Sequence, residues 1–188
     1  MRQMTFKEYK RLDLGIWLLM IVIFEGIATL ASNSWFAAQP VVISITISIV
    51  SAVMMRWSWY AAMHAIAGGF AFCLASGATV EQYAIYCIGN LGTLVSMILI
   101  HFWGKERIRL DNVKRTLLVI AAYTGAVFGR WGVSLIFDGS IETLKVFMMT
   151  DIVSLLFAVV VIHLLARLDG MIEDQKHYLL RIAREKDR

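Results

Sequence analysis

The sequence predicts an all-α integral membrane protein, built as a bundle of six transmembrane helices. Hydrophobic residues make up 59% of the 188-residue chain and charged residues only 17%, whereas roughly a quarter of a soluble domain is charged. The apolar residues stand in runs of about 20, the length that an α-helix needs to cross a ~30 Å hydrocarbon layer. The chain contains one proline, which fits continuous helices with short connections.

Each predicted span is an apolar run that ends at polar or turn-forming residues. A polar segment from Ser32 to Gln39 closes the first run, and Pro40 suits the first turn of the next helix. Arg56 marks the following turn, and Ser76-Gly77 closes the third run. The predicted spans are about 12–31, 41–55, 57–74, 80–103, 116–137 and 141–166, all in a single domain covering 1–188. The charged tail, 167–188, is predicted to be a helix on the cytoplasmic surface.

The basic residues predict how the bundle is oriented. If six helices alternate in direction, 16 of the 18 Lys and Arg residues lie on one side. Lys and Arg near span ends favour the cytoplasm, so we expect both termini to be cytoplasmic, in a prokaryotic plasma membrane. The mean hydropathy of +0.69 fits the apolar spans, and the isoelectric point near 9.2 then reflects the topology of the basic residues and their contact with lipid headgroups. They do not indicate nucleic-acid binding.

Three ionisable residues are predicted to lie within the membrane. Glu25 is on the first span, Arg130 on the fifth and Asp151 on the sixth, each within about ten residues, or ~15 Å, of the outer end of its span. Charged groups at this depth are costly and usually face a cavity or one another. One interpretation is an Arg130–Asp151 ion pair that only holds two helices together. We favour the other, a polar pocket open to the outside that binds a small polar ligand.

Aromatic residues cluster at the same predicted level. Rings combined with a few fixed charges are typical of sites that bind heteroaromatic molecules, although an interfacial aromatic belt would explain individual rings. In the predicted pocket Arg130 holds an anionic or carbonyl group, and Glu25 and Asp151 pair with Arg130 or with a cationic ring. The candidate substrate-binding residues are Glu25, Trp35, Phe36, Tyr83, Tyr86, Asn90, Tyr123, Arg130, Trp131 and Asp151.

The sequence contains no motif that indicates catalysis. A nucleophile elbow, a metalloprotease helix, a phosphate-binding loop and a paired-carboxylate motif are all missing. Cys73 and Cys87 lack metal-ligand or redox spacing. We therefore predict a protein that is not an enzyme and that has no cofactor and no metal site. The sequence also lacks a nucleotide-binding domain, so transport would draw its energy from a gradient or from a partner.

In these features the chain resembles a substrate-binding S component of the energy-coupling factor (ECF) transporters, which are vitamin-uptake ABC importers. The resemblance covers nearly the whole chain in size and number of spans. More locally, it rests on Gln39-Pro40 before the second span, Arg56-Trp57-Ser58-Trp59 after it, Gly68-Gly69, and the stretch 83–90. It implies a pocket near the extracellular face, with Trp35 and Phe36 on a lid formed by the first loop. It also implies a transmembrane coupling subunit and two cytosolic ATPases as partners, and delivery of the ligand by toppling of the S component.

The resemblance further implies a docking stripe of small residues on the first span. Gly26, Ala28 and Ser32 are the candidates, although Ala28-xxx-Ser32 departs from the Ala-xxx-Ala pattern of the family. The expected cargo is a water-soluble vitamin, a vitamin precursor or a modified base, with haem as a more distant option. The alternatives are a gradient-driven secondary transporter of a small polar metabolite and a membrane assembly factor that does not transport.

Overall fold

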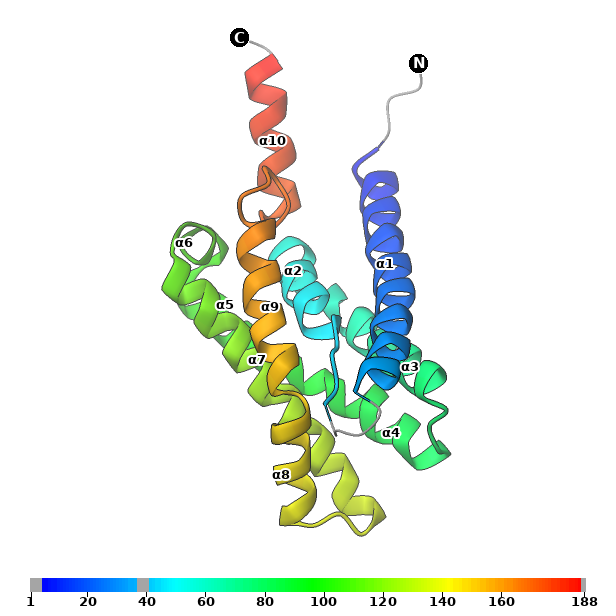
Figure 1. Cartoon of the computed structure of the whole chain (residues 1–188). Coiled ribbons are helices and arrows are strands. Elements are labelled where there is room, and N and C mark those ends of the chain that lie inside the picture. Colours follow the sequence, from blue (N-terminus) through cyan, green and yellow to red (C-terminus); the bar gives the residue numbers. More distant parts are fainter. Residues whose placement is uncertain (1–4, 37–40, 187–188) are drawn as a thin grey trace.

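The computed structural model describes residues 5–36 and 41–186, and every regular element in these ranges is a helix (Figure 1). The predicted all-α fold is therefore confirmed. The α-helices are α1 (Phe6–Trp35), α2 (Thr46–Trp57), α3 (Ala61–Ser76), α4 (Val80–Gly89), α5 (Met97–Trp103), α6 (Lys105–Leu110), α7 (Asn112–Ser134), α8 (Ile141–Thr150), α9 (Ile152–Leu165) and α10 (Gln175–Lys186). Three 3₁₀ segments link some of them: η1 (Ser58–Tyr60), η2 (Asn90–Ser96) and η3 (Leu135–Phe137).

Several helical stretches are long and apolar enough to cross a membrane. Among the described residues there are four, Phe6–Trp35, Thr46–Ser76, Val80–Trp103 and Asn112–Phe137, and the bent pair α8–α9 would make a fifth. The second stretch reverses direction at Ser58, where φ is +55°. The reversal brings Gly68 of α3 back against Thr46 of α2, so close that a Cβ atom at Gly68 would lie 2.3 Å from the Thr46 hydroxyl oxygen. Because α2 has only 12 residues, the six-span count stays a prediction.

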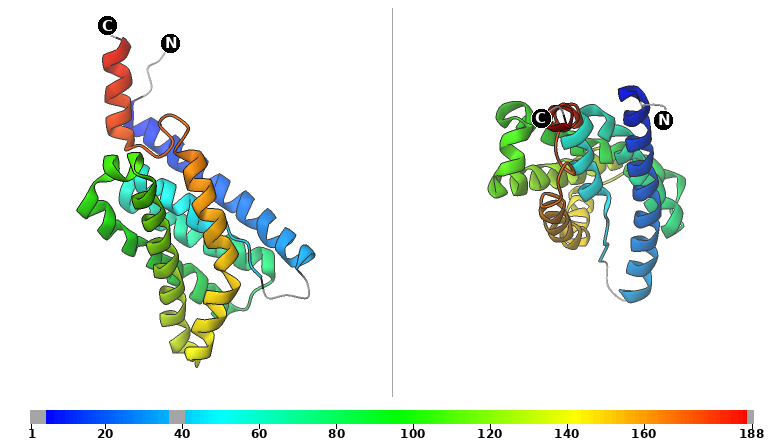
Figure 2. Two further views of the ribbon diagram at one scale, coloured as in Figure 1. Left: turned by 60° about the vertical axis from the view of Figure 1, so that its left-hand side comes forward. Right: turned by 90° about the horizontal axis from the view of Figure 1, so that it is seen from above.

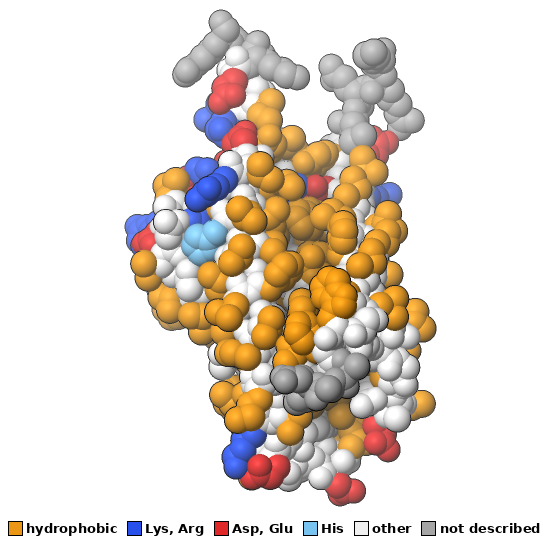
Figure 3. Space-filling model, viewed as in Figure 1, with side chains coloured by type: hydrophobic (Ala, Val, Ile, Leu, Met, Phe, Trp, Pro, Cys, Tyr) orange, Lys and Arg blue, Asp and Glu red, His pale blue; other side chains and the backbone are white. Residues whose placement is uncertain are grey.

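The start of α1 and the projecting helix α10 lie at the same end of the molecule (Figures 1 and 2). We call this the terminal end, and we call the opposite end, where α7 passes into α8, the distal end. Apolar side chains cover most of the face shown in Figure 3 between the two ends. This surface fits a protein with several membrane-embedded helices. The side of the membrane on which each end lies stays a prediction.

Helix α2 forms the centre of the bundle, and all 12 of its residues are buried. It packs against α1, α3, α7 and α9. Its side chains include the fully buried Ile47, Val50 and Met54, so α2 contributes to the core on every side. In the other long helices, by contrast, large apolar residues remain exposed on one face, as expected of helices that contact lipid.

Three boundaries differ from the sequence prediction. Helix α1 extends to Trp35 instead of ending near residue 31. Residues 41–45, predicted to begin a helix, precede α2 without regular structure, and Pro40 lies outside the described residues. The sixth predicted span is divided at Asp151, where α8 and α9 meet at 44°. Asp151 has φ −95° and ψ 0°, a conformation of the sparsely populated bridge region instead of a regular helix.

Glycines allow α7 to pass very close to the α4–η2 segment. A Cβ atom at Gly129 would lie 2.2 Å from the Gly89 carbonyl oxygen, and one at Gly125 would lie 2.1 Å from the Gly92 carbonyl oxygen. Two backbones can approach so closely only where the residues in contact have no Cβ atom. This contact brings the end of α4 against the part of α7 that carries Arg130, and so positions the site described next.

Candidate functional site

The three ionisable residues predicted to lie within the membrane do come together. They line one small cavity, together with side chains from α3, α4 and η2 and from residues 42–46. The cavity measures about 10 Å³, which is room for about one water molecule at most. Its lining residues are Glu25, Val42, Ser44, Thr46, Phe72, Tyr86, Asn90, Arg130 and Asp151. We call the polar members of this set, Glu25, Ser44, Thr46, Asn90, Arg130 and Asp151, the polar core.

Glu25 is fully buried and its carboxylate caps the N-terminus of α2. Its Oε2 atom accepts hydrogen bonds from the backbone N–H groups of Ile45 and Thr46, both 2.9 Å, and from the hydroxyls of Ser44 (3.0 Å) and Thr46 (2.9 Å). The first N–H groups of a helix lack intrahelical partners and carry a partial positive charge, so a carboxylate is well placed there. The second oxygen, Oε1, is buried and has no hydrogen-bond partner among the described residues.

Arg130 is 3% exposed and is surrounded by partners. Its Nη1 atom pairs with Oδ2 of Asp151, which is itself 2% exposed. Its Nε–H donates to Oδ1 of Asn90 at 2.8 Å, and its guanidinium lies 4.9 Å from the centre of the Tyr86 ring. Asn90 in turn donates to the Ala65 carbonyl oxygen at 3.3 Å. The Arg130–Asp151 pair thus connects α7 to the α8–α9 bend, and Asn90 connects it to α3.

The segment before α2 is held between α1 and the α8–α9 bend. The Val42 N–H donates to the Thr150 carbonyl oxygen at 3.0 Å. The Ser154 hydroxyl donates to the Val42 carbonyl oxygen at 2.9 Å and accepts from the Ser44 N–H at 2.9 Å. On its other side, Ser32 of α1 donates to the Val41 carbonyl oxygen at 3.1 Å. Residues 41–45 therefore form one wall of the polar core, held by hydrogen bonds to both neighbours.

The remaining predicted site residues lie outside this cavity. Tyr83 packs against Phe70, with ring centres 5.6 Å apart. The Tyr123 hydroxyl donates to the Met148 carbonyl oxygen at 2.9 Å, and the Trp131 indole N–H donates to the Ser140 carbonyl oxygen at 3.0 Å. These two contacts join α7 to α8 and its N-cap. The predicted lid residues lie at the end of α1, where Trp35 is 75% exposed and Phe36 half-buried.

The predicted docking residues do not share one surface. Gly26 and Ala28 are half-buried, whereas Ser32 is buried and its hydroxyl is used by the segment before α2. A partner could contact Gly26 and Ala28 from outside, but Ser32 faces the interior of the chain. Docking itself stays a prediction.

The sequence prediction missed Ser154, which holds the cavity wall, and four residues that line the cavity, Val42, Ser44, Thr46 and Phe72. A usable signal was present, because Ser44, Thr46 and Ser48 place a hydroxyl at every second position of an apolar run. Side-chain hydroxyls of this kind often mark a helix start. The contact between this segment and residue 154, however, joins positions 110 residues apart.

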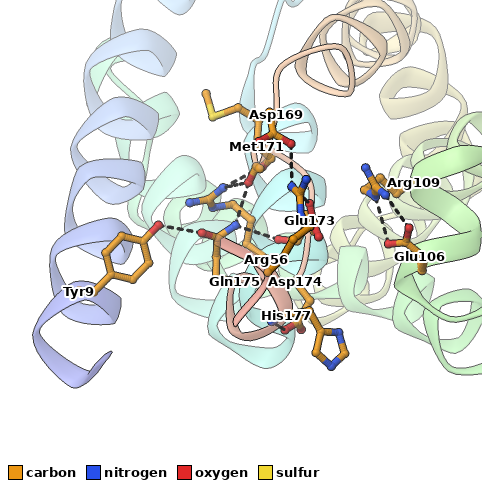
Figure 4. Close-up of polar contacts among 12 residues, drawn as sticks. Tyr9, Arg56, Glu106, Arg109, Asp169, Met171, Glu173, Asp174, Gln175 and His177 are labelled. Atoms are coloured by element: carbon orange, nitrogen blue, oxygen red, sulfur yellow. Dashed lines mark hydrogen bonds and ion pairs between the residues drawn. The ribbon is translucent and has the colours of Figure 1, made fainter. Parts of the chain in front are cut away.

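A second polar cluster lies at the terminal end, on the face where α10 joins the bundle (Figure 4). Arg56 is bidentate on Asp13, with distances of 2.5 and 3.1 Å, and its Nη1–H also donates to the carbonyl oxygens of Gly170 and Met171. The Trp57 indole N–H also donates to Asp13. The Tyr9 hydroxyl donates to Gln175, whose amide donates to the Gly170 carbonyl oxygen. We call Tyr9, Asp13, Arg56, Trp57 and Gln175 the terminal network.

Further ion pairs at this end of the molecule involve α6 and the residue before α10. Lys105 donates to Asp174 at 2.7 Å. Partial burial opposes ionisation of Asp174, but the Lys105 hydrogen bond and charge outweigh it and lower the pKa of the carboxyl. On α6, the Arg109 guanidinium holds the pKa of Glu106 below its usual value.

Comparisons with known proteins give no assignment. No protein-family model matches the chain, and neither a curated protein nor a solved structure gives a significant match. Within residues 5–36 and 41–186, no group of three or more His, Cys, Asp or Glu side chains is placed to hold a metal ion.

Proposed function

We propose that the chain is a membrane-embedded capture subunit that binds one small polar molecule in the polar core. In this role it is the S component of an ECF-type importer. The observation that supports the proposal most directly is the convergence of Glu25, Arg130 and Asp151, from different helices, on one cavity inside an apolar bundle. Ionisable residues at membrane depth are rare and usually functional.

The arrangement of charges favours binding over a purely structural role. One ion pair between Arg130 and Asp151 is enough to connect α7 with the α8–α9 bend, and a buried pair of this kind is weak evidence for stability. Glu25 adds a third buried charge to the site and has one oxygen with no hydrogen-bond partner among the described residues. Capping of α2 uses only Oε2 of Glu25, and a site that binds a polar ligand gives the second oxygen a role.

The cavity holds at most about one water molecule, so a larger ligand requires movement of its walls. Residues 41–45 are the natural wall to move, because they precede the helix and, among the described residues, are held mainly by side chains and single backbone bonds. Polar groups of a ligand would replace these bonds. Tyr86 and Phe72, whose ring centres are 4.5 Å apart, would contact its apolar part.

In the proposed importer the chain captures its cargo without changing it chemically. A transmembrane coupling subunit and two cytosolic ATPases would supply the energy. The predicted cargo is a water-soluble vitamin, a vitamin precursor or a modified base. The prokaryotic plasma membrane and cytoplasmic termini belong to the same proposal.

The test is intrinsic tryptophan fluorescence of the purified chain in detergent, titrated with a panel of vitamins, vitamin precursors and haem. We expect saturable quenching by one compound, with a dissociation constant between nanomolar and micromolar. The double variant Arg130→Met/Asp151→Leu removes both charges of the pair together and should lose this response, whereas Lys145→Ala, at an exposed site on α8, should keep it. A flat response from folded, ligand-free protein would contradict the proposal and favour an assembly factor.

A gradient-driven secondary transporter is the second candidate, because Glu25 and Asp151 are buried carboxyl groups that could carry protons. Uptake by the chain alone in proteoliposomes distinguishes the two. Accumulation that depends on a pH gradient, without ATPases, would establish the secondary transporter, whereas the capture subunit binds its cargo but does not accumulate it alone.

A further inference from the structure

The polar core carries more negative than positive charge. Its ionisable side chains are Glu25, Asp151 and Arg130, all at most 3% exposed. Arg130 already has partners: it pairs with Asp151, donates a hydrogen bond to Asn90 and lies over the ring of Tyr86. Among the described residues, no Lys or Arg forms an ion pair with Glu25. With all three groups ionised, the site has one negative charge in excess.

The N-terminus of α2 compensates this charge only in part. A helix N-terminus is equivalent to about half a positive charge, and here all its contacts go to a single oxygen, Oε2 of Glu25. The other oxygen, Oε1, is buried without a donor, and it is the one such atom among the described side chains that line the cavity. A buried acceptor without a partner is costly, so the site is incomplete at this atom.

We propose that the molecule captured in the polar core is a small organic cation that donates an N–H hydrogen bond to Oε1 of Glu25. Protonated amines, amidinium groups and protonated nitrogen heterocycles belong to this class. The inference rests on the proposed function, because it names the substrate class of the same site.

The walls of the cavity favour an organic cation over a bare metal ion. Phe72 and Tyr86 present aromatic rings to the cavity, and ring faces attract flat cations. A hard metal ion needs six or more oxygen ligands, but Oε1 is the one fully buried side-chain oxygen of the cavity that lacks a donor among the described residues. A single N–H group would satisfy it.

The test uses three probes that share one ring and differ in charge: benzamidinium, benzamide and benzoate. Each is titrated at pH 7 into the full chain in detergent, and binding is measured by calorimetry. Benzamide also donates N–H groups but carries no charge, so the added attraction between opposite charges should make benzamidinium bind at least about 10-fold more tightly than benzamide. Benzoate should bind least. Benzamide or benzoate binding as tightly as benzamidinium would overturn the inference.

The matched variants are Glu25→Gln, which removes the charge and keeps the shape, and Glu81→Gln, an exposed control on α4. The preference for benzamidinium should disappear in the first and persist in the second. A preference that survives Glu25→Gln would overturn the inference. If Glu25→Gln does not fold, the ranking of the three probes on the native chain decides alone. Stabilisation by NaCl with no effect of benzamidinium would assign an inorganic cation and also overturn it.

The probe experiment and the fluorescence panel distinguish failure of this inference from failure of the proposed function. A neutral or anionic vitamin that binds in the fluorescence panel would support capture and overturn the cationic class. A flat response to both the panel and the probes would contradict capture, and the inference with it.

Discussion

At the terminal end Arg56 bonds to Asp13 and two backbone carbonyls, whereas in the polar core Arg130 bonds to Asp151 and Asn90 beside a cavity. Asp13 has a second partner in Trp57, so its charge is well satisfied. Glu25, beside Arg130, has an oxygen with no partner among the described residues. Both regions connect distant segments through buried arginines. Of the two, the polar core is the one in which a buried carboxylate oxygen lacks a donor among the described residues, so a further molecule can bond to it.

The largest effect should come from breaking the pair in the polar core. Arg130→Ala leaves Asp151 buried without its cation, which should lower the free energy of unfolding by about 3–5 kcal/mol. Unfolding in mixed detergent and SDS micelles measures this change. Arg130→Met/Asp151→Leu should recover most of the loss, because it removes both charges of the pair together. A single variant as stable as the native chain would show that the pair contributes little to the fold.

Breaking the terminal network should have a smaller effect and leave capture intact. Arg56→Ala leaves Asp13 bonded to Trp57, so we expect a loss of about 2–3 kcal/mol. Hydrogen exchange should accelerate over residues 167–186, which Arg56 holds through Gly170 and Met171. Arg11→Ala, at an exposed position on α1, serves as the control. Loss of ligand binding in Arg56→Ala would mean that the two regions are coupled.

Substitution at the α7 contact tests how the polar core is positioned. Gly129→Ala places a methyl group against the backbone of Gly89, and overpacking of this kind typically costs about 1–3 kcal/mol. It should also weaken binding, since Arg130 and Asn90 lie beside the contact. Gly132→Ala is the matched control, because a Cβ atom there meets no atom within 4 Å. Equal effects at both positions would argue against a close contact.

The smallest effect should be a pH dependence at the terminal end. The lowered pKa of Asp174 means that its pairing with Lys105 stabilises the fold at neutral pH. This contribution should be lost as the pH falls below about 4, the unfolded value for Asp. A partly exposed pair of this kind contributes at most about 1 kcal/mol. Protease accessibility of α10 should rise on acidification, and Asp174→Asn should remove that change.

The helical fold class and the charged residues of the polar core could be predicted from the sequence alone. Apolar runs predict helices reliably, and Glu25, Arg130 and Asp151 stand out because charge is rare in such runs. Their meeting at one cavity also followed from their similar depth in the predicted spans. The aromatic prediction was less specific, since of the rings proposed for the site Tyr86 is the one that lines this cavity.

The start of α2 shows what the sequence could not provide. Residues 41–45 are β-branched apart from Ser44, a composition that lowers helix propensity only slightly, and the alternating hydroxyls of the segment do not by themselves fix where the helix begins. The helix begins at Thr46 because Glu25, 21 residues earlier in the chain, caps its N-terminus there. Likewise the terminal network depends on Arg56 reaching residues 170 and 171, a contact that no spacing rule predicts.

The burial of α2 on all sides also constrains the order of assembly. Helix α9, one of the helices that pack against α2, is synthesised about a hundred residues after it, and the hydroxyl of Ser154 completes the wall of the polar core only then. Until that helix arrives, the central segment lacks part of its packing and some of its hydrogen-bond partners. The middle of this protein is therefore completed late, by a helix from near the end of the chain.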